Sequence, residues 1–564
     1  MAAKITRIPG LNLHAARAFA AQAAAKPQSQ AFQALPKQDV ETSTLPNGLT
    51  VTTLENYSPI TRLAIVVKAG ARYEDGHTLG ITHTLRNAAG LATKSHSKFA
   101  ITKNIEYLGG NLTACTTREH LIYLLECNRD DVHTALKFAT EVAFLPAFKH
   151  WEVGDVAPHM RRELAVFRQN REAVLVEALH KAAFRGGLAN SLYIEDFLVG
   201  HYCHNKLSQF VKKHVSAPRA VLSLVGAENR RVVDALKNFD LPTDPGAEFL
   251  PCKFGTGECS VTPELAQAPW PPPNKEGIRP KPVSSRLVIG SWASSGLSSG
   301  AHKEVEDALF EWFLSTRAVN MTISVPILAV KANQFAYMLY ETDRAGWRLA
   351  QRFKERHGIV YEATTGEVRI ESPGEFVDAA VVVEGAGVQN TKECVALGVF
   401  AHILGTGPRL PYSESQATKL GEAAAKATQN PFAATALNIN YSDTGLFGVA
   451  LAGHPDDMDK LTKAVMGQVR SVAQKVADKD VQEAKQRLKA ALLYGRENQT
   501  DVAVEMGVHQ SRSGQPWRHD DLVQAIDAVT TQDVATVAAR VSKAKPAMAA
   551  IGRLHKTPHL DELL

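Results

Sequence analysis

The sequence predicts an α+β fold of two tandem domains related by internal duplication, each with a mostly antiparallel sheet and helices packed on one face. Two observations predict this fold. Apolar strand-like runs and helical patterns follow one another in a similar order in both halves, and short matches recur at a nearly constant offset. The matches pair Val215-Ser216 with Val541-Ser542, Gly226 with Gly552, and residues 117–123 with residues 442–448.

Two strands are predicted at Leu63–Ala69 and Ala379–Val383, because both runs are apolar, contain β-branched residues and have a glycine close behind. Near the end of each half a helical pattern is followed by another strand, at Pro218–Gly226 and Pro546–Gly552. Apolar residues at helical spacing predict four helices, at Leu79–Ala89, Val395–Leu404, Asp456–Val476 and Asp480–Tyr494. Asp480 with Glu483 predicts that the last helix begins at Asp480.

Residues 246–360 resemble neither half. They hold four of the six tryptophans, and a proline-rich linker at 268–273 lies near their start. Without this segment, the offset between the halves shrinks to a sensible length for one domain. We therefore expect domains at 40–245 and 361–564, with 246–360 a linker plus an atypical insert. The insert is either a genuine part of the protein, folded or disordered, or a translated intron.

Residues 1–38 have the composition of a mitochondrial targeting segment. They contain five basic residues and no acidic one, with Leu11, Ala15 and Phe19 at helical spacing. Cleavage is expected after Phe19, and the alternative is a disordered basic tail. The net charge of the whole chain, +5, equals the excess in this segment. The rest of the chain is neutral, so we expect no nucleic-acid partner.

Two further observations concern the environment of the protein. No run of 18 or more apolar residues occurs, so a membrane-spanning helix is not expected and membrane association would be through partners. The six cysteines include no C-x-x-C pair, which favours free thiols in a reducing compartment.

A degenerate metal motif lies in residues 80–87, on a predicted helix that follows a strand and Gly70. Its spacing matches H-x-x-E-H, in which two histidines bind Zn²⁺ and the glutamate takes a proton from the zinc-bound water. Only His83 remains. Arg86 replaces the proton acceptor, and Asn87 replaces the second imidazole. A guanidinium cannot accept a proton, and its charge opposes a bound dication.

Glu163 lies close to where a distal carboxylate ligand would fall. We interpret His83, Arg86, Asn87 and Glu163 as remnants of a former cleft, and we expect no catalytic residue, no metal site and no cofactor-binding residue. The segment from His201 to His204 contains ligand-type residues without a second cluster, which favours a surface turn.

This order of strand, helix and degenerate motif resembles the pitrilysin/mitochondrial processing peptidase family. The resemblance covers about 40–245 and 361–564, and within the family it is closest to the core subunits of respiratory complex III. In the first half it rests on TLPNGL (44–49), LENYSP (54–59), KAGARYED (68–75), GGNL (109–112), TRE (117–119) and HWEV (150–153). In the second half it rests on ATQNPF (427–432) and NYSDTGLFG (440–448).

The resemblance implies two tandem domains around an internal cavity and a subunit without catalytic residues. It implies assembly with core protein 1 and other complex III subunits, including cytochrome b and the iron–sulfur protein, on the matrix side of the mitochondrial inner membrane. The hemes and the iron–sulfur cluster belong to those other subunits, so no cofactor is expected here.

Three alternatives remain open from the sequence. In the first alternative, the chain is an active zinc subunit of mitochondrial processing peptidase. Arg86 and Asn87 argue against this alternative. In the second alternative, the chain is the non-catalytic subunit of that peptidase. That subunit has a long glycine-rich loop, which would fall at residues 402–412, where this chain has only a short loop. In the third alternative, the wall of its cavity, with His83 and Glu163, forms part of the active site of a partner.

Overall fold

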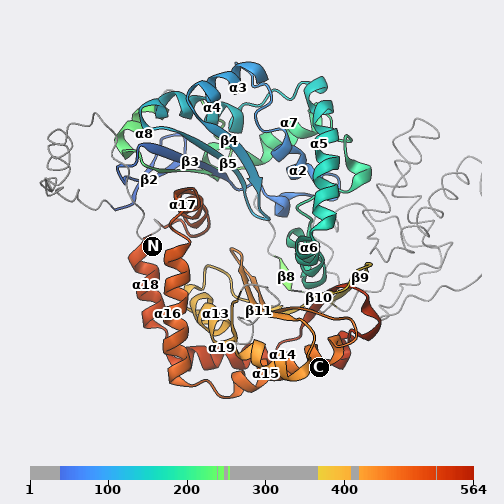
Figure 1. Ribbon diagram of the computed structural model, residues 1–564. Helices are drawn as coiled ribbons and strands as arrows, with labels where there is room; N and C mark the ends of the chain where they lie inside the picture. The colour runs from blue at the N-terminus through green and yellow to red at the C-terminus, as the bar shows by residue number, and fades with distance from the viewer. Residues whose placement is uncertain are drawn as a thin grey trace, which may run out of the picture. The chain divides into compact units, whose positions relative to one another are not determined.

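The computed structural model describes residues 39–237, 239–246, 252–254, 366–407, 418–515 and 518–563. The expected targeting segment at 1–38, nearly all of the expected insert and the end of the 402–412 loop lie outside the described residues. Residues 40–563 contain two halves of like design, each a sheet with helices against it (Figure 1).

The sheet of the first half has six strands in the order β1-β2-β7-β3-β5-β4. Only the β2–β7 pair is parallel. Its strands are β1 (Glu41–Thr44), β2 (Thr50–Leu54), β3 (Ile60–Val67), β4 (Asn111–Thr116), β5 (Leu121–Asn128) and β7 (Ala220–Val225). The helices of this half are α2 (Ile81–Asn87), α3 (Lys98–Tyr107), α4 (Val132–Phe144), α5 (His150–Gln169), α6 (Arg171–Ala183), α7 (His204–His214) and α8 (Asn229–Leu236).

The sheet of the second half has five strands in the order β11-β12-β10-β13-β9. They are β9 (Glu367–Glu371), β10 (Val377–Glu384), β11 (Ala433–Asn440), β12 (Gly445–Gly453) and β13 (Ala547–Gly552). The helices are α13 (Thr391–Leu404), α14 (Lys419–Ala427), α15 (Met458–Gln474), α16 (Asp478–Tyr494), α17 (Gln499–Ser513), α18 (His519–Ala528) and α19 (Thr531–Lys543).

The two sheets confirm the predicted duplication. Taken in the order β2-β7-β3-β5-β4 and β9-β13-β10-β12-β11, they have the same connectivity, and β9–β13 is parallel as β2–β7 is. Gly226 and Gly552, which follow β7 and β13, both have positive φ values, +87° and +136°. Glycine adopts such angles without strain, so one backbone feature recurs at both positions.

The predicted elements agree with the structure at most positions. Leu63–Ala69 lies largely in β3, Ala379–Val383 lies in β10, and the helices predicted near Leu79, Val395 and Asp456 are α2, α13 and α15. The predicted start at Asp480 is wrong, because α16 begins at Asp478. The acidic first turn comes from Asp478 and Asp480 together, so the charge pattern indicated the helix but not its first residue.

Each sheet also receives a helix from the other half. On the face of the first sheet away from α4, helix α17 packs over β3 and β7 through Val502, Ala503 and Met506. In the second half, α6 packs over β13 and β10 through Leu175, Ala178, Leu179 and Ala182. Figure 1 shows α17 beside the first sheet and α6 beside the second. Neither half therefore buries its own sheet completely.

The close approach of α17 depends on a glycine. A Cβ atom on Gly507 would lie 2.7 Å from Cγ2 of Val66 and 3.3 Å from Cβ of Ser223. Any side chain there would push the helix off β3 and β7 and reduce the buried apolar area.

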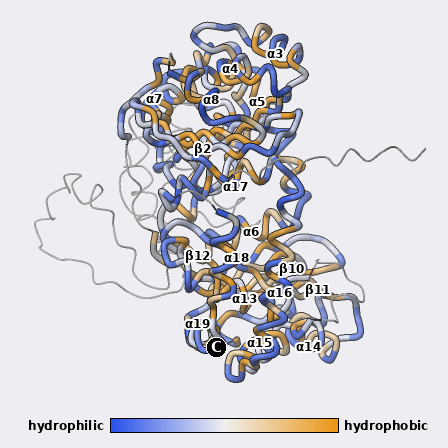
Figure 2. The backbone as a smooth tube through the Cα atoms, turned by 90° about the vertical axis from the view of Figure 1, so that its left-hand side faces the viewer, coloured by the Kyte–Doolittle hydropathy of each residue, from blue (hydrophilic) through white to orange (hydrophobic). Residues whose placement is uncertain are grey.

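Hydrophobic residues concentrate in the strands and in the helices that contact them, as Figure 2 shows for β10 and α13. No helix in the described ranges is long and apolar enough to cross a membrane.

Buried histidines at the junction of the halves predict acid sensitivity. Burial, with Arg118 nearby, lowers the pKa of His180 to about 3, and burial, with Arg512 nearby, lowers the pKa of His120 to about 3. Below pH 6.5 the unfolded chain binds protons that the folded chain excludes, so stability is full above pH 6.5 and falls as the pH decreases. From pH 7.5 to pH 5 we expect a loss of about 2 kcal/mol per histidine in urea unfolding.

The His180→Gln variant should lose part of this pH dependence, because glutamine does not titrate. The control is His77→Gln, since His77 is exposed. Identical pH profiles for His180→Gln and the unaltered protein would contradict the prediction.

Candidate functional site

Helix α2, which carries the degenerate motif, is fixed at its beginning by a buried carboxyl group. Glu74 Oε2 accepts a hydrogen bond from the Gly80 amide at 2.7 Å, and Oε1 accepts bonds from the Thr82 amide at 2.9 Å and hydroxyl at 2.6 Å. Burial raises the pKa of Glu74 to about 7, although these hydrogen bonds lower it. The position of His83 therefore follows from the segment between β3 and α2.

His83 is fully buried beneath α5. Its Nδ1 accepts a hydrogen bond from the Ile194 amide at 3.4 Å, so the proton of the neutral ring is on Nε2. Nε2 donates to Glu163 Oε2 at 3.0 Å. Burial lowers the pKa of His83, and the charge of Arg86 adds to this effect, while the bond to Glu163 opposes it.

Glu163, on α5, brings the other predicted residues together. Arg86 Nη2 donates to its Oε1, and Asn87 Nδ2 donates to its Oε2 at 2.9 Å. Burial acts to raise the pKa of Glu163, but the bonds from His83 and Asn87 and the charge of Arg86 lower it to about 2. The four residues form one closed network in which the carboxylate has three donors.

Two residues of this site, His159 and Tyr193, were not predicted from the sequence. His159 Nδ1 bonds Asn87 Oδ1 at 2.8 Å. Tyr193 packs edge-on against His83 at a ring-centroid distance of 5.4 Å, lies 5.7 Å from the Arg86 guanidinium carbon, and stacks on Phe167 at 3.9 Å. His159 lies one helical turn before Glu163, which is a signal the sequence contains. Tyr193 comes from a distant segment and has no such signal.

The network offers a metal ion one imidazole and one carboxylate. A catalytic zinc site uses three protein ligands and an open position, and here the third is a neutral amide whose Nδ2 donates to the carboxylate. The Arg86 guanidinium already supplies the positive charge beside Glu163. Glu163, with a pKa of about 2, is also a poor proton acceptor at neutral pH.

Other ligand-type residues do not gather. His204 Nδ1 bonds the Phe148 carbonyl at 3.0 Å, and His201 Nε2 lies 3.3 Å from Lys206 Nζ. Within the described ranges, no group of three or more His, Cys, Asp or Glu side chains is placed to hold a metal ion.

The Glu163 network predicts a stability effect. Glu163→Ala removes the common acceptor of His83, Arg86 and Asn87, so we expect a loss of about 1–3 kcal/mol in the free energy of unfolding at pH 7. Because the folded-state pKa is about 2 against an ordinary 4.5, this contribution is full above pH 4.5 and is lost as the pH falls toward 2.

Chemical unfolding at pH 7 and pH 3 measures both parts of this effect. Glu106→Ala, at an exposed carboxyl group on α3, is the matched control. An equal change in the two variants would contradict the prediction.

Both halves of the chain match models of one peptidase family. Residues 50–196 match the model of the insulinase family, peptidase family M16, and residues 350–488 match the model of the M16 peptidase inactive domain. Residues 302–363 match a third model, the Tc5 transposase DNA-binding domain.

Similar proteins extend along nearly the whole chain. The human cytochrome b-c1 complex subunit 2, mitochondrial, is 31% identical over 97% of this chain and 95% of that protein, and its mouse counterpart is 30% identical over 94% and 93%. The probable mitochondrial-processing peptidase subunit alpha-2 of Arabidopsis thaliana is 22% identical over 93% of this chain and 84% of that protein. The chain therefore belongs to the M16 peptidase family, in the branch that contains cytochrome b-c1 complex subunit 2.

Proposed function

We propose that this chain is a non-catalytic structural and assembly subunit of the mitochondrial cytochrome b-c1 complex, respiratory complex III or ubiquinol–cytochrome c reductase. The observation that carries the proposal is the ion pair of Arg86 with Glu163 at the position where an M16 enzyme needs a proton acceptor and a metal. The similarity to subunit 2 of that complex, at 31% identity over 97% of the chain, supports the same assignment.

The proposal extends to partners and location. The chain assembles with core protein 1 and with other complex III subunits, including cytochrome b and the iron–sulfur protein. It is peripheral on the matrix side of the inner membrane, bound through partners, and carries no cofactor of its own. The basic, acid-free segment at 1–38 supports import into mitochondria.

A role in mitochondrial processing peptidase is the weaker alternative. The alpha-2 subunit of the Arabidopsis thaliana processing peptidase is 22% identical to this chain over 93% of its length, against 31% over 97% for the human complex III subunit. A catalytic role also requires a general base at position 86, where this chain has Arg86, and the Glu163 carboxylate already has three donors.

We also propose that the expected insert at 246–360 is extra to the two M16 halves as far as residue 349, since 350–360 fall within the second M16 match. The first M16 match ends at 196 and the second begins at 350, and a model from a different family covers 302–363. Phe254 and Val368, on either side of residues 255–365, both pack against the same hydrophobic cluster, so the chain leaves and re-enters the body at this cluster. The body can thus be continuous without the segment between them.

Native electrophoresis of solubilised mitochondria tests the assignment. We expect the chain to comigrate with complex III, and migration only as a free dimer of peptidase size would contradict it. The intact mass of the subunit from the same band tests the domain proposal. It should begin after the targeting segment and either include residues 246–360 or lack a block within them, whereas a block missing from either M16 half would contradict that proposal.

A second experiment tests the loss of catalysis. Arg86→Glu combined with Asn87→His restores the motif residues, but we expect no zinc-dependent hydrolysis of presequence peptides, since the rest of the site is not arranged for it. Metal analysis and peptide turnover, with and without core protein 1, are the measurements. Turnover by the unaltered chain, or faster cleavage when it is mixed with core protein 1 than by core protein 1 alone, would reject a purely structural role.

A further inference from the structure

Two hairpin turns related by the internal repeat meet at the junction of the halves. One joins β4 to β5 at Thr117–His120, and the other joins β11 to β12 at Tyr441–Thr444. Each turn is held against a glycine: a Cβ atom on Gly70 would lie 2.5 Å from the Glu119 carbonyl carbon, and one on Gly387 would lie 2.5 Å from the Asp443 carbonyl carbon. The backbone thus places both turns with little freedom.

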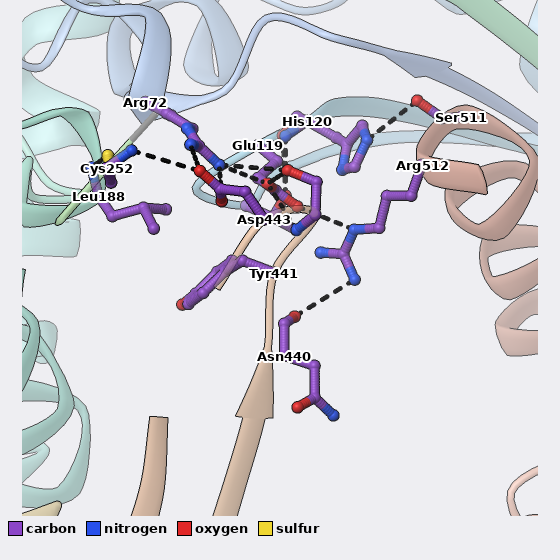
Figure 3. Close-up of polar contacts among 12 residues, drawn as sticks. Arg72, Glu119, His120, Leu188, Cys252, Asn440, Tyr441, Asp443, Ser511 and Arg512 are labelled. Carbon is purple, nitrogen blue, oxygen red and sulfur yellow. Dashed lines mark hydrogen bonds and ion pairs between the residues drawn. The ribbon is translucent and has the colours of Figure 1, made fainter. Parts of the chain in front are cut away.

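Four charged side chains connect these turns, as Figure 3 shows. Arg72 Nη1 donates to Glu119 Oε1 and to Asp443 Oδ1, both at 2.8 Å, and Arg72 Nη2 donates to Asp443 Oδ2 at 2.5 Å. Arg512 Nε, on α17, lies 2.8 Å from Glu119 Oε2. Two cations and two anions therefore balance, and every ion pair except Arg72–Glu119 joins one half to the other.

The turn of the first half also contacts α6 and α17, the two helices that pack on the sheet of the opposite half. Arg118 Nη2 donates to Glu177 Oε1 of α6 at 2.7 Å, and His120 Nε2 lies 3.1 Å from Ser511 Oγ of α17. The Ser442 amide and hydroxyl donate to Glu119 Oε1 at 3.1 and 2.5 Å. Three consecutive residues of one turn thus bind α6, the opposite turn and α17.

The charged side chains of this cluster are largely buried, so removing one of them is costly. The side chains of Arg72 and Glu119 are 1% and 5% exposed, and those of Asp443 and Arg512 are each 19% exposed. Burial raises the pKa of Glu119, but Arg512, His120 and the bonds from Ser442 keep it below its ordinary value. Removing one partner of such a network leaves a buried charge without its counter-ion.

We propose that Arg72, Glu119, Asp443 and Arg512 form a lock that holds the two halves together without the covalent connection between them, so that the chain stays assembled after it is cut between Phe254 and Gly366. The apolar packing of α6 and α17 on the sheets of the opposite halves supplies the rest of the contact area. The lock is independent of any enzymatic activity and does not rest on membership of complex III.

The test uses the full chain with one protease recognition sequence placed within residues 255–365. After cleavage, native size-exclusion chromatography with mass detection should show one particle that contains both fragments, and dilution should give the dissociation constant of the fragments. Arg72→Gln should raise that constant about a hundredfold or more, because it removes the shared donor of Glu119 and Asp443. Asp443→Asn is the milder variant in case Arg72→Gln does not fold.

Arg168→Gln is the matched control, because the ion pair of Arg168 with Asp196 lies within the first half and both side chains are more than half exposed. It should leave the dissociation constant unchanged. Separation of the fragments from the unaltered protein after cleavage would overturn the proposal. So would a dissociation constant for the Arg72→Gln and Asp443→Asn proteins equal to that of the control.

Discussion

The carboxylate of Glu119 lies between two guanidinium groups, Arg72 from its own half and Arg512 from the other. Removing any one of these charges is costly, because its partner is then left buried without a counter-ion. The reciprocal placement of α6 and α17 depends on the same turn, through Arg118 and His120. The junction therefore fixes how the two sheets are covered.

The junction is linked to the degenerate site through a short stretch of backbone. Arg72 lies two residues before Glu74, and Glu74 holds the first turn of α2, on which His83 lies. Asn190 Nδ2 donates to the carbonyls of both Ala71 and Glu74 at 3.0 Å, so this stretch is also held from the side. The stretch of chain that supports α2 therefore also takes part in the contact between the halves.

The site around Glu163 is held together by charge and hydrogen bonds from three side chains. A metal ion between His83 and Glu163 would neutralise the carboxylate, and the Arg86 guanidinium provides positive charge at the same carboxylate. Asn87 donates to Glu163 as well, so the second histidine of an active motif is replaced by a group that stabilises the anion. Such a network contributes to stability without a group free to accept a proton, which agrees with the proposed structural role.

The sequence by itself determined the duplication, the main strands and helices, and the identity of the residues at the degenerate motif. These features are local or repeat along the chain: apolar periodicity, glycine positions and the spacing of His83, Arg86 and Asn87. It also indicated Glu163, but not His159 or Tyr193, which complete the site. Only the tertiary structure decided that α6 and α17 cover the sheets of the opposite halves and that Arg72 pairs with Asp443. An apolar helix face shows that a helix is buried but not against which sheet, and pairing between charges hundreds of residues apart depends on the folded path of the chain.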